Sequence, residues 1–426
     1  MNEKIKLTFR ALRHRNYRLF FSGQCISLTG TWIQQVAISW LIYSLTNSAL
    51  LMGTIMFAGS VPSLIISPFA GVLVDRINKH RALIILQALF MIEAFIIAIL
   101  TLTGVIQVWH IVVLSILMGI TNAFDMPLRQ AFIIQLVDAN EDVGNAISLN
   151  SSSFNLARLI GPAVAGVLIA GVGEGICFLL NALSYIAVVW ALLLMKLKVE
   201  PARKTTDKNV FQEFKEGLKY SFDSVPIRSI LIFLSITSLI GMSFPVLMPI
   251  FAKEILKGNA QTLGFLMSFS GVGALIGALY LAGKKSALGL ENWIYAASLI
   301  FGLGLSGLAF ANNILVSLVL LFATGLGMVV IIASCNTLLQ HLVDDDKRGR
   351  VMSLYTMAFM GSAPLGSLCG GTLADKIGVP HTFLLSGVGM IIATLIFRVN
   401  RKYFKAKPKP LQKLPSEKIK NCSLVD

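Results

Sequence analysis

The sequence predicts an all-α integral membrane protein with twelve transmembrane helices in two pseudo-symmetric halves of six. Its 426 residues are 55% hydrophobic and only 13% charged, with a mean hydropathy of +0.76. Soluble domains carry about 25% charged residues, so this composition excludes a soluble globular chain of this length. The apolar runs continue over about 20 residues, which suits helices that cross a bilayer, whereas the strands of a membrane barrel alternate.

A weak internal repeat supports the division into two halves. The tripeptide Leu-Val-Asp at 136–138 recurs at 342–344, and Pro162 has a counterpart at Pro364, in both cases about 200 residues further on. Halves related by a pseudo-two-fold axis are the usual consequence of such a repeat in a membrane fold.

The limits of the apolar runs define the predicted helices and domains. The helices occupy residues 18–45, 49–74, 82–103, 108–128, 145–170, 175–195, 228–252, 260–282, 292–311, 313–340, 351–373 and 380–398. The predicted domains are a lead-in at 1–17, an N-terminal half at 18–195, a linker at 196–227, a C-terminal half at 228–398 and a basic tail at 399–426. The lead-in alternates apolar residues with arginines, so we expect an amphipathic segment at the membrane interface.

The net charge of +15 follows membrane topology. Thirty-two of the 36 Lys and Arg residues lie in the termini or in the connections from even-numbered to odd-numbered helices. The opposite side has only Lys253, Lys257 and Lys376, and Arg158 alone lies within a helix. This asymmetry predicts a multi-pass protein of the inner (plasma) membrane with both termini in the cytoplasm. It also removes the reason to expect a nucleic-acid partner.

A short polar hinge separates the second and third predicted helices. It contains Gly71, Asp75, Arg76 and Arg81 between two apolar segments. This Gly-x-x-x-Asp-Arg pattern, followed by a basic run, resembles the cytoplasmic loop between helices 2 and 3 of the major facilitator superfamily of transporters. The resemblance implies a gate that closes the cytoplasmic side, with Asp125 as the acid that pairs with the basic residues. An ordinary positive-inside loop is the alternative.

Asn78 stands in this hinge where the superfamily usually has a glycine. Asparagine tolerates the left-handed backbone conformation better than most residues do. We therefore expect the tight turn to survive with Asn78 in that conformation.

Three further strings resemble the branch of the superfamily that holds the enterobactin exporter and related secretion and drug-efflux permeases. They run from 122 to 132, from 153 to 163 and from 177 to 182. The Gly161-Pro162 pair in the second string is similar to the fifth-helix motif of antiporters, which favours export over uptake. The resemblance assigns this pair and Arg129 to gating, together with the hinge.

A polar face follows the first predicted helix. Gln24, Ser27, Thr31 and Gln35 are spaced by three and four residues, so their side chains lie on one side of an otherwise apolar cylinder. Such a face either lines a cavity or makes hydrogen bonds to a neighbouring helix. The sequence leaves both alternatives open.

The fifth predicted helix carries a second polar face, which includes Asn155 and Arg158. An unpaired arginine inside a membrane bundle is costly. Arg158 therefore pairs with an acid of the protein such as Glu93, or it meets an anionic group of the substrate. The residues expected to line the substrate path are Gln24, Thr31, Gln35, Asn122, Asn155, Arg158 and Asn336.

Glu93 lies near the middle of the third predicted helix. A carboxylate at membrane depth is costly unless it is paired or protonated, and by default it marks function. We expect a role in proton coupling. A neutral glutamic acid that is hydrogen-bonded to a neighbouring helix is the alternative.

Together, the resemblance and these residues imply a secondary active transporter that exports a small amphipathic or aromatic molecule, such as a siderophore, in exchange for protons. A broad-specificity drug efflux pump of the same fold and a lysophospholipid transporter are the alternatives. No nucleophile, base and orienting acid converge, so we expect no enzyme. We also expect no cofactor and no metal, because the acidic run at 344–346 suits a helix N-terminus. The expected partners are a small-molecule substrate, protons and the lipid bilayer, and a monomer would suffice.

Overall fold

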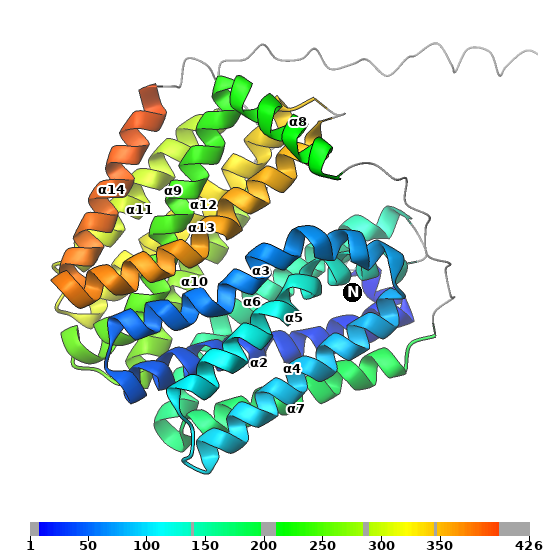
Figure 1. Cartoon of the computed structure of the whole chain (residues 1–426), viewed down its shortest axis with the longest axis horizontal. Coiled ribbons are helices and arrows are strands. Elements are labelled where there is room, and N and C mark those ends of the chain that lie inside the picture. Colours follow the sequence, from blue (N-terminus) through cyan, green and yellow to red (C-terminus); the bar gives the residue numbers. More distant parts are fainter. Residues whose placement is uncertain (1–7, 138–139, 197–209, 284–288, 345–346, 400–426) are drawn as a thin grey trace, which may run out of the picture.

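A computed structural model describes residues 8–137, 140–196, 210–283, 289–344 and 347–399. These residues form helices and connecting turns without a strand, which confirms the predicted all-α class. Figure 1 shows two groups of helices that lean against each other.

The N-terminal half begins with a short 3-10 helix that precedes six long helices. The elements are η1 (Arg10–Arg13), α2 (Arg15–Thr46), α3 (Ala49–Arg76), α4 (Lys79–Leu102), α5 (Val108–Gln135), α6 (Asn140–Val172) and α7 (Glu174–Leu193).

The C-terminal half follows a shorter helix, α8 (Val210–Asp223). Its elements are α9 (Val225–Ile250), the π-helical turn η2 (Phe251–Ile255), α10 (Ala260–Ala282), α11 (Leu290–Leu308), α12 (Ile314–Leu342), α13 (Arg348–Ile377) and α14 (Val379–Val399).

Ten of the described helices are long and apolar enough to cross a membrane. The other two long helices, α11 and α13, complete the C-terminal half, because α11 packs on α12 and α14 while α13 packs on α9. The buried glycines Gly366, Gly370 and Gly371 make α13 less apolar by composition. They let α13 approach its neighbours closely, as small residues do in membrane bundles.

The turn between α3 and α4 consists of Ile77 and Asn78 alone. Asn78 has a φ of −70° in an extended conformation, and its side-chain oxygen accepts a hydrogen bond from the Arg81 main-chain nitrogen at 3.0 Å. The expected left-handed conformation of Asn78 is therefore wrong. The residue serves as the N-cap of α4, a position that asparagine favours.

The two halves contact each other through crossings lined by glycine. A Cβ added to Gly371 of α13 would lie 2.5 Å from the Ala49 main-chain oxygen and 2.8 Å from Gly53 Cα of α3. A Cβ added to Gly264 of α10 would lie 2.9 Å from Gly166 Cα of α6. Backbones this close leave no room for side chains at the crossings.

Both crossings lie toward one end of the bundle, where α2 and α9 end and α3 and α10 begin; we call it the closed end. The opposite end carries η1 and α8, and we call it the linker end. Toward the linker end α3 and α13 diverge, so that the halves form a V (Figure 1).

Candidate functional site

α6 is wedged between α2 of its own half and α10 of the other half. A Cβ added to Gly161 would lie 2.5 Å from Trp32 Cβ of α2, and one added to Gly271 of α10 would lie 3.1 Å from the Arg158 main-chain oxygen. Residues three or four apart share a helix face. Phe154 and Arg158 therefore lie on the strip of α6 that runs between these two contacts, which faces the space between the halves.

Arg158 is partly buried on this strip and has an aromatic neighbour but no counter-ion. Its guanidinium carbon lies 5.9 Å from the centroid of the Trp32 ring. Among the described residues, no ion pair joins Arg158 to a carboxylate. A cation–π contact contributes about 1–2 kcal/mol, whereas removing an ion from water costs several kcal/mol, so the charge remains poorly compensated.

Glu93 of α4 lies inside the N-terminal half, with 7% of the residue exposed. One carboxylate oxygen, Oε2, accepts a hydrogen bond from Gln34 Nε2 at 3.1 Å, and Gln34 Oε1 accepts one from Asn181 Nδ2 at 2.7 Å. The other oxygen, Oε1, is buried without a partner. The expected ion pair between Arg158 and Glu93 is therefore not found among the described residues.

Asp125 and Arg129 form a second polar cluster inside the same half. The Arg129 Nη2 atom donates to both carboxylate oxygens of Asp125, at 2.8 and 2.6 Å, and its Nη1 atom donates to Gln24 Oε1. Gln87 of α4 donates to Asp125 at 3.3 Å. These contacts tie α2, α4 and α5 together.

The polar face of α2 therefore turns into the N-terminal half. Gln24 is only 1% exposed, and the partly buried Thr31 hydroxyl lies 3.3 Å from the Tyr185 hydroxyl of α7. Of the two alternatives for this polar face, Gln24 and Thr31 fit hydrogen bonding between helices rather than the lining of a cavity. Gln35, in contrast, is exposed.

The hinge residues have a described position in the chain but few described contacts. Gly71 and Asp75 lie in the last turns of α3, but the contacts of these two residues lie outside what the structure describes. Arg76 and Arg81 are exposed. Asp125 pairs with Arg129 and Gln87, and no ion pair with Arg81 occurs in the described part of the chain. The gate role of the hinge remains a prediction.

The remaining predicted path residues are spread over three helices. Asn122 is exposed on α5. Asn155 is partly buried and donates to the Ser151 main-chain oxygen at 2.9 Å, while Asn336 of α12 accepts from Gln340 at 2.5 Å. The Pro162 main-chain oxygen lies at the crossing of α6 and α10, 2.5 Å from a Cβ added to Gly264.

Sequence reasoning missed four residues that matter at these sites. The spacing of the polar face on α2 admits Gln34 as well as Gln35, so the pattern alone could not choose between them. Asn181 stands as an isolated amide in an apolar helix, which was an available signal. Phe154 precedes Arg158 by one helical turn, but nothing in the pattern relates Trp32 to either residue.

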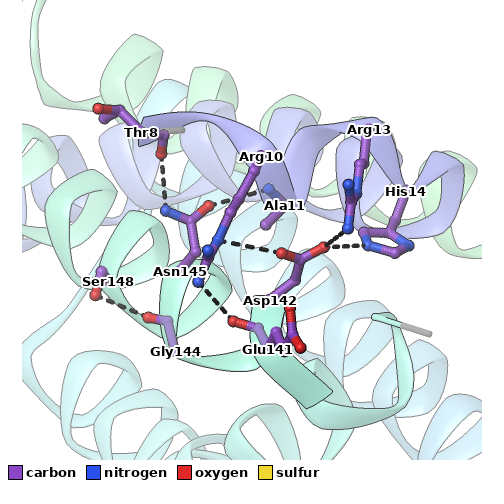
Figure 2. A network of polar contacts seen from close by, with 10 residues as sticks. All are labelled: Thr8, Arg10, Ala11, Arg13, His14, Glu141, Asp142, Gly144, Asn145 and Ser148. Carbon is purple, nitrogen blue, oxygen red and sulfur yellow. Dashed lines mark hydrogen bonds and ion pairs between the residues drawn. The ribbon is translucent and has the colours of Figure 1, made fainter. Parts of the chain in front are cut away.

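A third polar cluster fixes η1 to the start of α6 at the linker end (Figure 2). The buried Asp142 carboxylate forms an ion pair with Arg10, 3.1 Å from its Nε atom, and hydrogen bonds with Arg13 Nη2 at 2.6 Å and His14 Nε2 at 2.8 Å. Asn145, one turn further along α6, bonds to two main-chain groups of the lead-in. The predicted lead-in is thus attached to the helix that carries Arg158.

Two six-helix halves that cross at one end define a membrane transporter of the major facilitator fold. A solved structure supports this fold: a bacterial homologue of the iron transporter ferroportin, in an inward-facing state, superimposes with a TM-score of 0.73. The two sequences are 16% identical, and the alignment covers 92% of this chain and 99% of the other. At this identity the likeness concerns the fold alone.

The chain belongs to the transmembrane secretion effector family of major facilitator transporters, whose pattern matches residues 7–422. The staphyloferrin A transporter of Staphylococcus aureus is 30% identical over 387 residues, which is 90% of this chain and 96% of that protein. The multidrug efflux pump Tap of Mycolicibacterium fortuitum is 26% identical over 392 residues, or 89% and 95% of the two chains. The protein is therefore a multi-pass membrane transporter of small molecules.

Proposed function

We propose that this transporter is a secondary active exporter of a small amphipathic or aromatic molecule, such as a siderophore, and that it works by alternating access. The observation that carries the proposal is the packing of the halves, which is tight at the closed end, whereas α3 and α13 diverge toward the linker end. Likeness to a staphyloferrin A transporter supports the substrate class.

The distribution of charge supports an orientation with the linker end in the cytoplasm of the cell. Basic residues dominate the linker end, as the positive-inside rule requires of cytoplasmic segments in a plasma membrane. In this orientation the diverging ends of α3 and α13 lie on the cytoplasmic side. An exporter must load its substrate from that side.

The hinge would close the linker end in the alternate conformation. Asp75, Arg76 and Arg81 lie at the end of α3 and the start of α4, where a polar contact with the C-terminal half would hold the two halves together. Asp75→Asn is expected to lower transport and to raise the population of the conformation described here. If transport and both populations are unchanged in this variant, the hinge is not a gate.

Exchange for protons is the coupling that Glu93 supports. The Glu93 Oε1 atom is buried without a partner, so it can hold an exchangeable proton. The hydrogen bond from Gln34 to the same carboxyl group links protonation of Glu93 to α2. Glu93→Gln in proteoliposomes should abolish accumulation driven by a pH gradient but preserve substrate exchange at equal pH. Glu141→Gln changes an exposed acid at the linker end and serves as the control. Gradient-driven accumulation by Glu93→Gln at the wild-type rate would remove the coupling role.

The substrate class can be tested in cells. Small molecules inside and outside cells with and without the gene are profiled during growth in iron-poor medium. We expect an iron chelator to disappear from the medium and to build up in cells that lack the gene. If chelators are unchanged in both compartments, the siderophore assignment is wrong.

Broad drug efflux is the second candidate, because the multidrug efflux pump Tap and a macrolide efflux protein of Streptococcus pyogenes are among the relatives. It predicts that cells without the gene become sensitive to several unrelated compounds. The same pair of strains distinguishes the two candidates.

A further inference from the structure

We propose that Trp32, Phe154 and Arg158 form a binding subsite for an organic anion that carries a carboxylate next to an aromatic group. This inference rests on the proposed function and names the ligand chemistry at the strip of α6 between the halves. We call these three residues the Trp32 subsite.

The position of the subsite comes from the packing of α6. Gly161 contacts Trp32 on one side of the helix, and Gly271 contacts the Arg158 main chain on the other. Phe154 and Arg158 are one helical turn apart between these contacts. The subsite thus lies where α2 and α6 of one half meet α10 of the other. The affinity for a ligand bound there can therefore depend on the relative position of the halves.

The positive charge of Arg158 favours an anionic ligand. Arg158 has no carboxylate partner in the described ranges, and Glu93, the acid that the sequence suggested as its partner, accepts a hydrogen bond from Gln34. Arg158 is only partly buried, so part of its side chain is accessible. A carboxylate that meets its guanidinium could take the two parallel hydrogen bonds that this group offers.

The rings of Trp32 and Phe154 favour a ligand with an apolar group beside that anion. Trp32 and Phe154 meet edge to face, with ring centroids 5.7 Å apart and planes at 67°. Phe154 is 45% exposed although its ring packs on Trp32 of α2. An exposed ring within reach of a guanidinium fits a planar ligand that stacks on Phe154 while its carboxylate meets Arg158.

The same three residues disfavour other classes of ligand. A cationic drug would meet the uncompensated charge of Arg158, and a neutral molecule would leave that charge without a partner. A small anion without an apolar part would leave the Phe154 ring exposed. The subsite therefore distinguishes ligands by two features at once, and each feature can be removed from a probe separately.

The test measures equilibrium binding to the purified full-length transporter with three small probes. These are 2,3-dihydroxybenzoate, catechol, which lacks the carboxylate, and acetate, which lacks the ring. We expect 2,3-dihydroxybenzoate to bind at least tenfold more tightly than either of the others. Arg158→Gln should weaken its binding about 10- to 100-fold, the loss expected of charge-assisted hydrogen bonds. Trp32→Leu should weaken it about fivefold.

Matched variants separate binding from folding. Arg398→Gln removes an arginine that also lies on an aromatic ring, 4.6 Å from the Tyr295 centroid, but at the linker end of α14, and it should bind like the wild type. Arg158→Lys keeps the charge and should retain binding that is several times stronger than that of Arg158→Gln, because a lysine can still attract a carboxylate without the bidentate geometry.

Several results would overturn the inference. These are a wild type that binds none of the probes, one that binds catechol as well as 2,3-dihydroxybenzoate, and equal binding by Arg158→Lys and Arg158→Gln. Failure of the proposed function looks different: the wild type would bind the aromatic anion with the expected dependence on Arg158, yet move neither it nor ethidium against a gradient in proteoliposomes.

Discussion

The hydroxyl of Tyr43 joins the two halves at the closed end. Tyr43 is 2% exposed near the end of α2 and donates to the carboxylate of Glu254 in the π-helical turn η2. Lys253 in the same turn donates to Asn47 at 3.2 Å, and its ammonium lies 5.1 Å from the Tyr43 ring centroid. Single π-helical turns are frequent at functional sites, and this one presents two charged residues to the other half.

Tyr43→Phe should therefore raise the population of the conformation that is open at the closed end. A hydrogen bond to a charged acceptor contributes about 1.5–3 kcal/mol when it is buried. Glu254 is exposed, so solvent screening lowers this to about 1–2 kcal/mol. Because this bond exists only while the closed end is closed, its loss shifts the equilibrium about 5- to 30-fold.

The assay uses a cysteine that becomes reactive only on opening. Ala260 is 3% exposed at the start of α10, and its main-chain oxygen faces Gly166 of the other half. Ala260→Cys, in a background without the five native cysteines, is labelled with N-ethylmaleimide. The labelling rate follows the open population when opening is fast, so Tyr43→Phe should raise it about 5- to 30-fold.

A matched variant removes a tyrosine hydroxyl elsewhere. Tyr295 accepts a hydrogen bond from Arg398 within the C-terminal half, so Tyr295→Phe should leave the labelling rate unchanged. An unchanged rate in Tyr43→Phe, or an equal rise in both variants, would refute the latch between Tyr43 and Glu254.

Three further predictions concern other contacts. Gly371→Val should trap the conformation open at the closed end, because even a Cβ would lie 2.5 Å from the Ala49 oxygen; Ala260→Cys labelling should rise and transport should stop. Gly30→Ala places a Cβ 2.5 Å from Asn181 Oδ1 and should destabilise the N-terminal half by about 1–3 kcal/mol, seen as a lower Tm. Asp142→Asn leaves Arg10 and Arg13 of the lead-in without a counter-ion and weakens the contact with His14, so limited trypsin digestion at Arg13 should speed up severalfold, with transport measured in parallel.

The fold could be predicted from the sequence because the bilayer imposes a simple rule. A helix that crosses it needs a continuous apolar run, and such runs can be read along the chain. The rule applies less well to α11 and α13, which carry glycine and serine at buried positions. At Asn78, the residue type indicated the turn, but the same side chain could serve as a left-handed residue or as a cap, and the cap is found.

The candidate site could be predicted only in part. Arg158 and Glu93 stand out in the sequence because charges at membrane depth are rare. Their partners depend on how helices are rotated against each other, which no single sequence gives. The polar face of α2 illustrates this: Gln24 meets Arg129 inside the N-terminal half, whereas Gln35 on the same helix is exposed.

Distances between spin labels at the two ends of the bundle would test alternating access most directly. Val105 and Phe310 place one label in each half at the closed end, and Leu193 and Val399 do so at the linker end; all four side chains are exposed. In Gly371→Val, we predict that the first distance lengthens and the second shortens relative to the wild type, in the same fraction of molecules. If only one end changes, or if both ends lengthen together, the halves do not rock around a shared central site and the proposed mechanism is wrong.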